Sequence, residues 1–187
     1  LLGDDLLADV PTVYTVASSQ AVMVNMLPEI YYVPLGVMAK KSEMMSLTAQ
    51  GVSCLSSPLY LYDAATRKYQ EMKEGEEIKV QANEHGRYFL TQTRGTTGIE
   101  NAEIGESDVK IYSPVRGLIV VSKVSAPLLN KVEVYALDGK LVATGKAAGA
   151  TSVSIPIVST ASPQEVYIIK VSMQDTQVTI TRKLSLL

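Results

Sequence analysis

The chain is built from short segments rich in β-branched and aromatic residues, which are separated by polar turn residues. Such segments occupy residues 12–16, 59–62, 77–81 and 87–90, and this pattern is typical of β-strands. The best helical candidate, residues 64–72, lacks a sustained apolar stripe with a period of 3.6 residues, so we interpret it as a hairpin connection. The sequence therefore predicts an all-β protein.

The apolar alternation stops between residues 93 and 108, where Gly, Thr and acidic residues take its place. This change of composition is typical of a linker. We therefore predict two tandem β-sandwich domains, namely a module at 1–95, a linker at 96–108 and a second module at 109–187. Seven short strand-like segments in the second module favour an immunoglobulin-like sandwich. These segments lie at residues 109–112, 118–122, 131–137, 140–144, 152–155, 166–171 and 178–181.

One hairpin can be placed from its turn residues. Asp138-Gly139 is the kind of dipeptide that supplies the two positive-φ residues of a type I′ turn. A two-residue loop between Leu137 and Lys140 would place Ala136 opposite Leu141 and Val134 opposite Ala143. The apolar side of this hairpin is predicted to face the core.

Composition excludes several classes of protein. The 187 residues are 47% hydrophobic and 19% charged, with a net charge of −2. This balance favours a globular fold and gives no overall basic field for nucleic acid. No apolar run reaches the length of a membrane-spanning helix. The single cysteine, Cys54, rules out an internal disulfide, and we interpret it as a small buried hydrophobe. The opening LLGDD carries no initiator Met or signal pattern, so we expect an excised fragment, with any export signal upstream of it.

Residues for catalysis or metal binding are scarce in the sequence. His85 is the only histidine, so a His-rich metal site cannot form and a Ser-His-Asp triad would depend on this one residue. The segment 83–86 (NEHG) is typical of a turn with a solvated histidine. The acidic residues Asp4, Asp5 and Asp9 lack the spacing of a calcium loop, and no phosphate-binding motif occurs. We predict no catalytic residue, metal or cofactor, and no enzyme.

Tyrosine is the one frequent aromatic residue, with 10 copies against one Phe and no Trp. If Leu59 and Leu61 face the core, strand alternation places Tyr60 and Tyr62 together on the opposite face. With Tyr69 and Tyr88, they could bind a sugar or a protein surface. Packing of the rings across strands explains the same pattern, and both interpretations stay open.

Several segments together resemble a known family. In the second half these are 109–118 (VKIYSPVRGL), 132–142 (VEVYALDGKLV), 166–171 (VYIIKV) and 178–187; in the first half they are 13–16, 27–28, 33–37, 59–63 and 86–90. In this order they resemble the C-terminal region of Bacteroidetes secreted proteins, in which a β-sandwich module precedes a type IX secretion sorting domain. The chain departs from the family at Ser113, where Asn is usual, and at Glu165-Val166, where a Gly is usual.

This resemblance implies a noncatalytic C-terminal module of a secreted or cell-surface protein, which serves export, anchoring or spacing. The implied partners are the upstream domains of the same polypeptide and the outer-membrane secretion or attachment machinery. The alternative function is a carbohydrate- or protein-binding adhesion module that uses the Tyr-bearing sheet face. Nucleic acid is not an expected partner.

Overall fold

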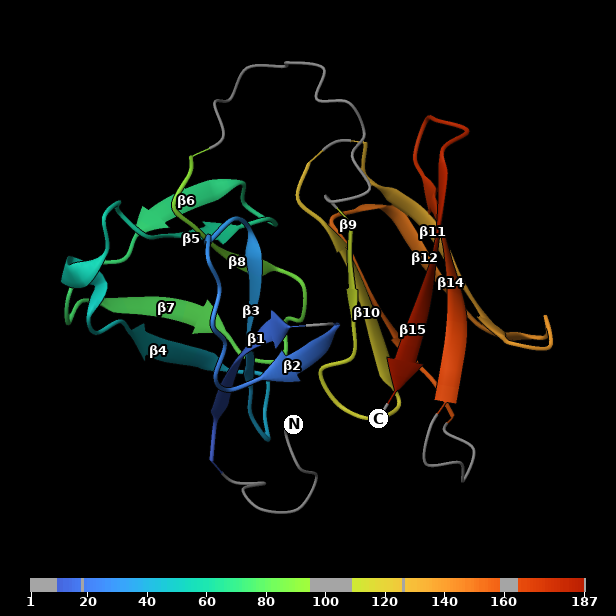
Figure 1. The fold of residues 1–187 in the computed structure, drawn as a ribbon, viewed down its shortest axis with the longest axis horizontal. Helices are drawn as coiled ribbons and strands as arrows, with labels where there is room; N and C mark the ends of the chain where they lie inside the picture. The colour runs from blue at the N-terminus through green and yellow to red at the C-terminus, as the bar shows by residue number, and fades with distance from the viewer. Residues whose placement is uncertain (1–9, 18, 95–108, 126, 159–164, 187) are drawn as a thin grey trace. The chain divides into compact units, whose positions relative to one another are not determined.

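The computed structural model describes residues 10–17, 19–94, 109–125, 127–158 and 165–186 (Figure 1). These residues divide into two compact units: unit 1 takes in 10–16 and 22–94, and unit 2 takes in 17, 19–21 and 109–186. The predicted linker at 96–108 and the acidic residues Asp4, Asp5 and Asp9 lie outside the described residues.

The strands between residues 12 and 91 form two antiparallel sheets. The larger sheet has six strands in the order β2-β1-β3-β8-β5-β6, and β4 pairs with β7 in the smaller one. A short 3-10 turn, η1 (Val52–Cys54), lies between β4 and β5. The strands are β1 (Thr12–Ala17), β2 (Gln20–Val22), β3 (Val33–Met38), β4 (Met44–Thr48), β5 (Tyr60–Asp63), β6 (Lys68–Glu71), β7 (Glu77–Gln81) and β8 (Tyr88–Thr91).

The core of unit 1 lies between these two sheets. Ile78 and Val80 of β7 are at most 1% exposed, whereas the alternating residues Glu77 and Lys79 are exposed to solvent. This alternation is what a half-buried strand requires. From the larger sheet, buried residues of β3, β5 and β8 join the same cluster, including Leu35, Leu61 and Tyr88. Unit 1 is therefore a β-sandwich.

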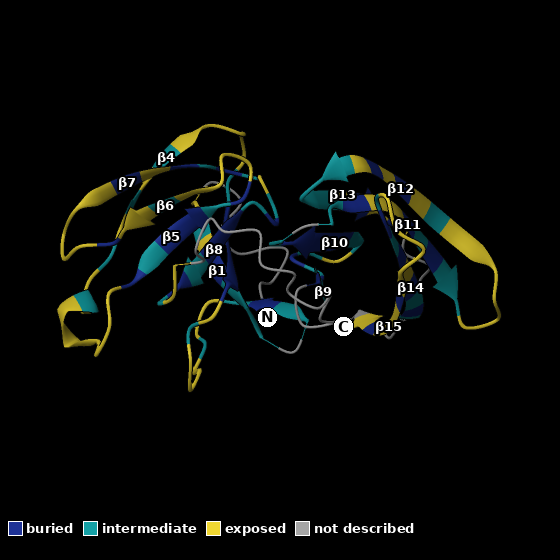
Figure 2. Cartoon of the chain, turned by 90° about the horizontal axis from the view of Figure 1, so that it is seen from above, coloured by how far each residue is buried: buried dark blue, intermediate teal, exposed yellow. Residues whose placement is uncertain are grey.

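Unit 2 also consists of two antiparallel sheets, of three strands (β13-β10-β9) and four strands (β12-β11-β14-β15). Figure 2 shows buried residues within the strands of each unit. The two sheets contribute to one core, with Ile119 and Ile155 on one side and Val132, Val134 and Ile169 on the other. The strands are β9 (Val109–Tyr112), β10 (Leu118–Lys123), β11 (Leu129–Ala136), β12 (Leu141–Ala150), β13 (Ser152–Pro156), β14 (Glu165–Met173) and β15 (Thr179–Leu186).

The all-β prediction is confirmed, and the interpretation of residues 64–72 is wrong in part. The hairpin connection is shorter than predicted, because β6 (Lys68–Glu71) pairs with β5 from Tyr60↔Glu71 to Asp63↔Lys68. This strand is the edge of its sheet and three of its four residues are exposed. The sequence of β6 is therefore polar and lacks the apolar alternation from which a strand can be predicted.

The Asp138-Gly139 hairpin exists, but its turn differs from the predicted one. Gly139 has φ 85°, whereas Asp138 is not among the positive-φ residues. The Gly139 N–H donates to the Ala136 carbonyl (3.0 Å), and the Ala136 N–H donates to that of Lys140 (2.9 Å). The loop thus has three residues, with a type I turn followed by a left-handed Gly.

The strand register follows from this longer loop. Val134 lies opposite Ala143 as predicted, but Tyr135, rather than Ala136, lies opposite Leu141. An irregularity between Val134 and Tyr135 absorbs the difference. Such a bulge places two residues of one strand opposite one residue of the other. The loop can therefore be one residue longer than predicted, while the pairs from Val134↔Ala143 onward keep the predicted register.

Cys54 is exposed, which contradicts the expected burial. It ends η1 in the connection between β4 and β5, where the neighbouring Ser53, Leu55 and Ser56 are exposed as well. Connections of this kind run over the surface because their backbone polar groups need solvent.

Candidate functional site

The four predicted tyrosines lie on three adjacent strands of unit 1. Tyr62 of β5 and Tyr69 of β6 are direct cross-strand partners, with ring centroids 4.6 Å apart. Tyr60 lies on β5 opposite Glu71, and Tyr88 lies on β8 opposite Asp63. The sheet thus brings Tyr62 and Tyr69 together and leaves Tyr88 on the core side.

Tyr62 is the centre of an aromatic cluster that the sequence did not predict as a unit. Its ring meets Tyr32 edge-to-face at 5.6 Å and contacts Phe89 at 6.4 Å, and Tyr31 meets Tyr32 edge-to-face at 5.0 Å. The hydroxyls of Tyr32 and Tyr69 are hydrogen-bonded. Burial, and then the neighbouring Tyr69, raise the pKa of Tyr62. Edge-to-face pairs stabilise a fold beyond the area they bury, so this cluster accounts for much of the tyrosine content as packing.

Of the two interpretations of Tyr60 and Tyr62, the structure favours packing for Tyr62. This residue is only 6% exposed because aromatic rings from the 31–32 segment, β6 and β8 surround it. Tyr88 is 4% exposed in the core, and its hydroxyl accepts a hydrogen bond from the Gln81 N–H at 2.9 Å. Neither ring presents a flat face to a ligand.

A smaller accessible aromatic surface remains. Tyr31 is 55% exposed, and Tyr60 and Tyr69 are partly exposed. The Arg94 guanidinium lies 4.3 Å from the centroid of the Tyr60 ring, a cation–π geometry. We call Tyr31, Tyr60, Tyr69 and Arg94 the aromatic surface of unit 1.

His85 lies in the predicted turn, but it is half-buried rather than fully solvated. Its Nδ1 is 2.7 Å from the hydroxyl of Tyr14, a side chain that is only 1% exposed. Burial lowers the pKa of His85, which favours the neutral imidazole. In the tautomer that carries its proton on Nε2, Nδ1 accepts the hydroxyl hydrogen of Tyr14. The Tyr14 ring lies over Gly36, where an added Cβ would be 2.2 Å from its Cζ. Sequence reasoning missed this contact because 71 residues separate its partners.

A second polar contact joins β5 to the same turn. The Arg87 Nε donates to Asp63 Oδ1 and its Nη2 donates to Oδ2, both at 2.9 Å. Burial acts to raise the pKa of Asp63, but the hydrogen bonds and charge of Arg87 hold it below its usual value. Both side chains are mostly buried. This bidentate pair is a structural brace of the kind that planar guanidinium groups form best.

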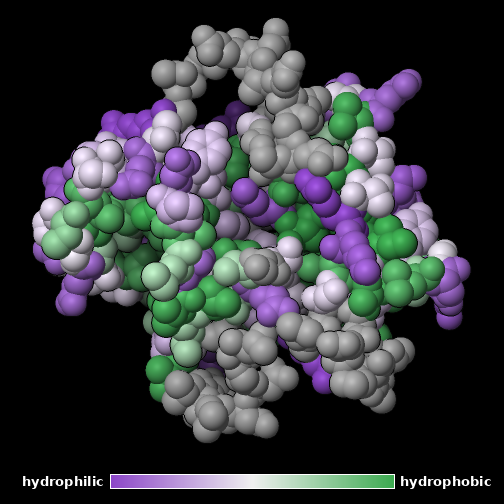
Figure 3. Space-filling view, viewed as in Figure 1, coloured by the Kyte–Doolittle hydropathy of each residue, from purple (hydrophilic) through white to green (hydrophobic). Residues whose placement is uncertain are grey.

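An exposed apolar segment connects β2 and β3. Met23, Val24 and Met26 are 67%, 84% and 92% exposed, and Figure 3 shows hydrophobic residues at the surface among polar ones. Asn25 Nδ2 donates to the Val16 carbonyl (3.1 Å) and to Thr15 Oγ1 (3.2 Å). This side chain therefore holds the segment against β1 while its apolar neighbours face solvent.

Two comparisons with known proteins found no match. No protein-family model matches the chain, and no curated protein matches it. Within the part of the chain that the structure describes, no three His, Cys, Asp or Glu side chains are grouped as a metal site would need. Of the same residues, none belongs to a helix long and apolar enough to span a bilayer.

Proposed function

We propose that the chain is a noncatalytic, two-module part of a larger secreted or cell-surface protein, and that it serves export, anchoring or spacing. The resemblance to C-terminal modules of type IX secretion substrates is the starting point. The all-β architecture agrees with that family's sandwich modules. We also infer that unit 2 is immunoglobulin-like, because its three-stranded and four-stranded sheets enclose one core.

The observation that carries this proposal is the docking of β15. It pairs with β14 along its whole length, from Ser172↔Thr179 to Glu165↔Leu186. Ile180 and Leu184 are only 4% and 2% exposed within the core of unit 2. A segment that resembles the family's closing strand is thus an integral strand, which a secretion machinery would meet as part of a folded module.

An export experiment tests the proposal. Residues 1–187 are fused behind a periplasmic passenger in a bacterium with a working type IX system, and the passenger is assayed at the cell surface and in the periplasm. We expect surface delivery that depends on both the fused chain and the secretion system. A folded passenger that stays in the periplasm would overturn the export proposal.

The second candidate function is adhesion through the aromatic surface of unit 1. The observation that favours it is the 55% exposure of Tyr31, because exposed aromatic rings offer faces for sugars and proteins. Tyr31→Ala should abolish adhesion of cells that display the chain, whereas Phe89→Leu, a change in the buried cluster, should alter stability alone. Equal adhesion by wild type and Tyr31→Ala would exclude this surface.

A further inference from the structure

Charge is distributed very unevenly along the chain. The whole sequence has a net charge of −2, yet residues 109–187 carry nine Lys and Arg against four Asp and Glu, a net charge of +5. The second half of the chain is therefore basic, although the net charge of the whole sequence is slightly negative. Because electrostatic attraction depends on where charges lie, the position of these cations in unit 2 decides what they can do.

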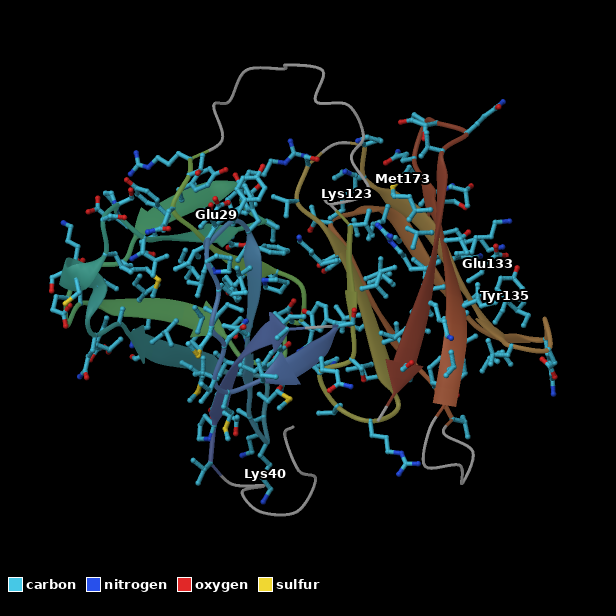
Figure 4. The ribbon with its side chains drawn as sticks, viewed as in Figure 1. Glu29, Lys40, Lys123, Glu133, Tyr135 and Met173 are labelled. Atoms are coloured by element: carbon cyan, nitrogen blue, oxygen red, sulfur yellow. The ribbon has the colours of Figure 1, made fainter. Side chains whose placement is uncertain are left out.

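Four lysines of unit 2 lie on one face of the sheet β12-β11-β14-β15. Val132 and Val134 of β11 point into the core, so Lys131, Glu133 and Tyr135 alternate to the outer face. Figure 4 shows Glu133 and Tyr135 on the same side of β11. By the same alternation Lys146, Lys170 and Lys183 lie on this outer face, and all four lysines are exposed. We call these four residues, with Glu133 and Tyr135, the lysine face.

The lysines run diagonally across the strands. Lys131 lies opposite Lys146 of β12. Lys170 lies opposite Glu133, two residues further along β11, and Lys183 lies opposite Ile168, two residues along β14 from Lys170. With strands about 4.8 Å apart and a rise of about 3.3 Å per residue, each diagonal step is roughly 8 Å. The positive charges thus form a line over a pleated surface.

This arrangement is locally unfavourable. Lys131 and Lys146 are direct cross-strand partners, and like charges in that position destabilise a sheet. The single acid of the face, Glu133, is bound to Lys131 with 2.6 Å between Nζ and Oε1. The hydrogen bond from Lys131, aided by the charges of Lys131 and Lys170, lowers the pKa of Glu133. Glu133 is therefore ionised and offsets one lysine of the four.

We propose that the lysine face binds an acidic polysaccharide. A line of cations on a broad sheet face fits an extended chain with repeated negative charges. The face also offers the exposed hydroxyls of Thr144, Thr181 and Ser185, and the partly exposed ring of Tyr135, which suit sugar hydroxyls and sugar rings. This inference goes beyond the proposed function, because it concerns a ligand of unit 2 and holds whether or not the chain directs export.

Binding is measured with the full chain and two dextrans that differ only in charge. Calorimetry in low-salt buffer compares dextran sulfate with neutral dextran, and polygalacturonate tests a carboxylated chain. The face variant combines Lys146→Gln, Lys170→Gln and Lys183→Gln, which leaves the Lys131–Glu133 pair intact. The control has the same change of net charge, made at exposed lysines of unit 1. Its substitutions are Lys41→Gln, Lys68→Gln and Lys73→Gln.

Wild type should bind dextran sulfate and polygalacturonate but not neutral dextran, with an affinity that falls as salt rises. The face variant should lose roughly tenfold in affinity, since each exposed contact contributes a factor of about two. The control variant should bind as wild type does. Lys146→Gln alone should raise the unfolding temperature of unit 2, because it removes the like-charge pair with Lys131.

Three results would overturn the proposal. The first is absence of binding to both acidic polysaccharides in low salt. The second is an equal loss in the face and control variants, which would mean that total charge rather than the face is responsible. The third is tighter binding to duplex DNA or phosphatidylglycerol vesicles than to either acidic polysaccharide, which would assign the face to a different class of partner.

Discussion

Replacing Gly36 with Ala should destabilise unit 1, although the same change in an unobstructed strand would stabilise it. Ala restricts the unfolded chain more than Gly does, and this normally stabilises by about 0.4–1 kcal/mol. In β3, however, the new Cβ would be 2.2 Å from Tyr14 Cζ and 2.3 Å from its Oη. The buried ring must therefore move by about 1 Å to reach ordinary contact distance.

Two costs follow from that displacement. Overpacking a filled site costs about 1–3 kcal/mol, and loss of the Tyr14–His85 hydrogen bond costs about 1 kcal/mol more. The restriction of the unfolded chain by Ala offsets part of these two costs. We therefore expect the free energy of unfolding of unit 1 to fall by about 1–3 kcal/mol.

Denaturant unfolding followed by tyrosine fluorescence measures this change. There is no Trp, and only Tyr112, Tyr135 and Tyr167 of the 10 tyrosines lie in the second half, so the signal reports mainly on unit 1. In a double-mutant cycle, Tyr14→Leu should relieve the clash, and Gly36→Ala should cost much less in that background. A neutral or stabilising Gly36→Ala in the wild-type background would refute the packing of Tyr14 over Gly36.

Three further predictions concern other parts of the chain. Burial lowers the pKa of His85 in the folded state, so the unfolded state binds a proton more readily. The free energy of unfolding should therefore fall as the pH drops below about 6.5. In His85→Asn, denaturation midpoints should no longer show this fall. Arg87→Ala leaves the mostly buried Asp63 without its bidentate partner, and should cost about 1.5–3 kcal/mol in urea unfolding, whereas Lys79→Ala at an exposed pair should leave the midpoint unchanged. Gly139→Val places a β-branched residue at φ 85° and should destabilise unit 2 by about 1–3 kcal/mol. An unaltered melting temperature would show that residue 139 does not need a positive φ.

The strands of this fold could be predicted where alternation was strong. In β7 the order Glu77, Ile78, Lys79, Val80 corresponds directly to exposed and buried positions. In β9 the predicted and observed bounds are the same, Val109–Tyr112. The edge strand β6 escaped prediction because an edge with exposed residues needs no apolar side chains.

Contacts between distant segments could not be predicted. The aromatic cluster depends on the 31–32 segment meeting β5 and β6, and the Tyr14–His85 bond joins the two ends of unit 1. Strand alternation placed Tyr62 on the face opposite Leu61, but burial of that face depends on rings from elsewhere in the chain. The lysine face was hidden for a similar reason, since only the register of four strands brings its members together.

We propose that the docked strand β15 is needed for delivery of the protein to the cell surface. Ile180 and Thr181 are adjacent in β15, and Ile180 is buried whereas Thr181 is exposed. Ile180→Asp would place a carboxylate in the core and undock the strand, while Thr181→Asp adds the same charge to the solvent side. In the native host, surface accessibility of the full-length protein to added protease measures the outcome. Thr181→Asp should be delivered normally, and Ile180→Asp should lose delivery. Equal delivery of both variants, with β15 undocked in Ile180→Asp, would contradict a role of the docked strand.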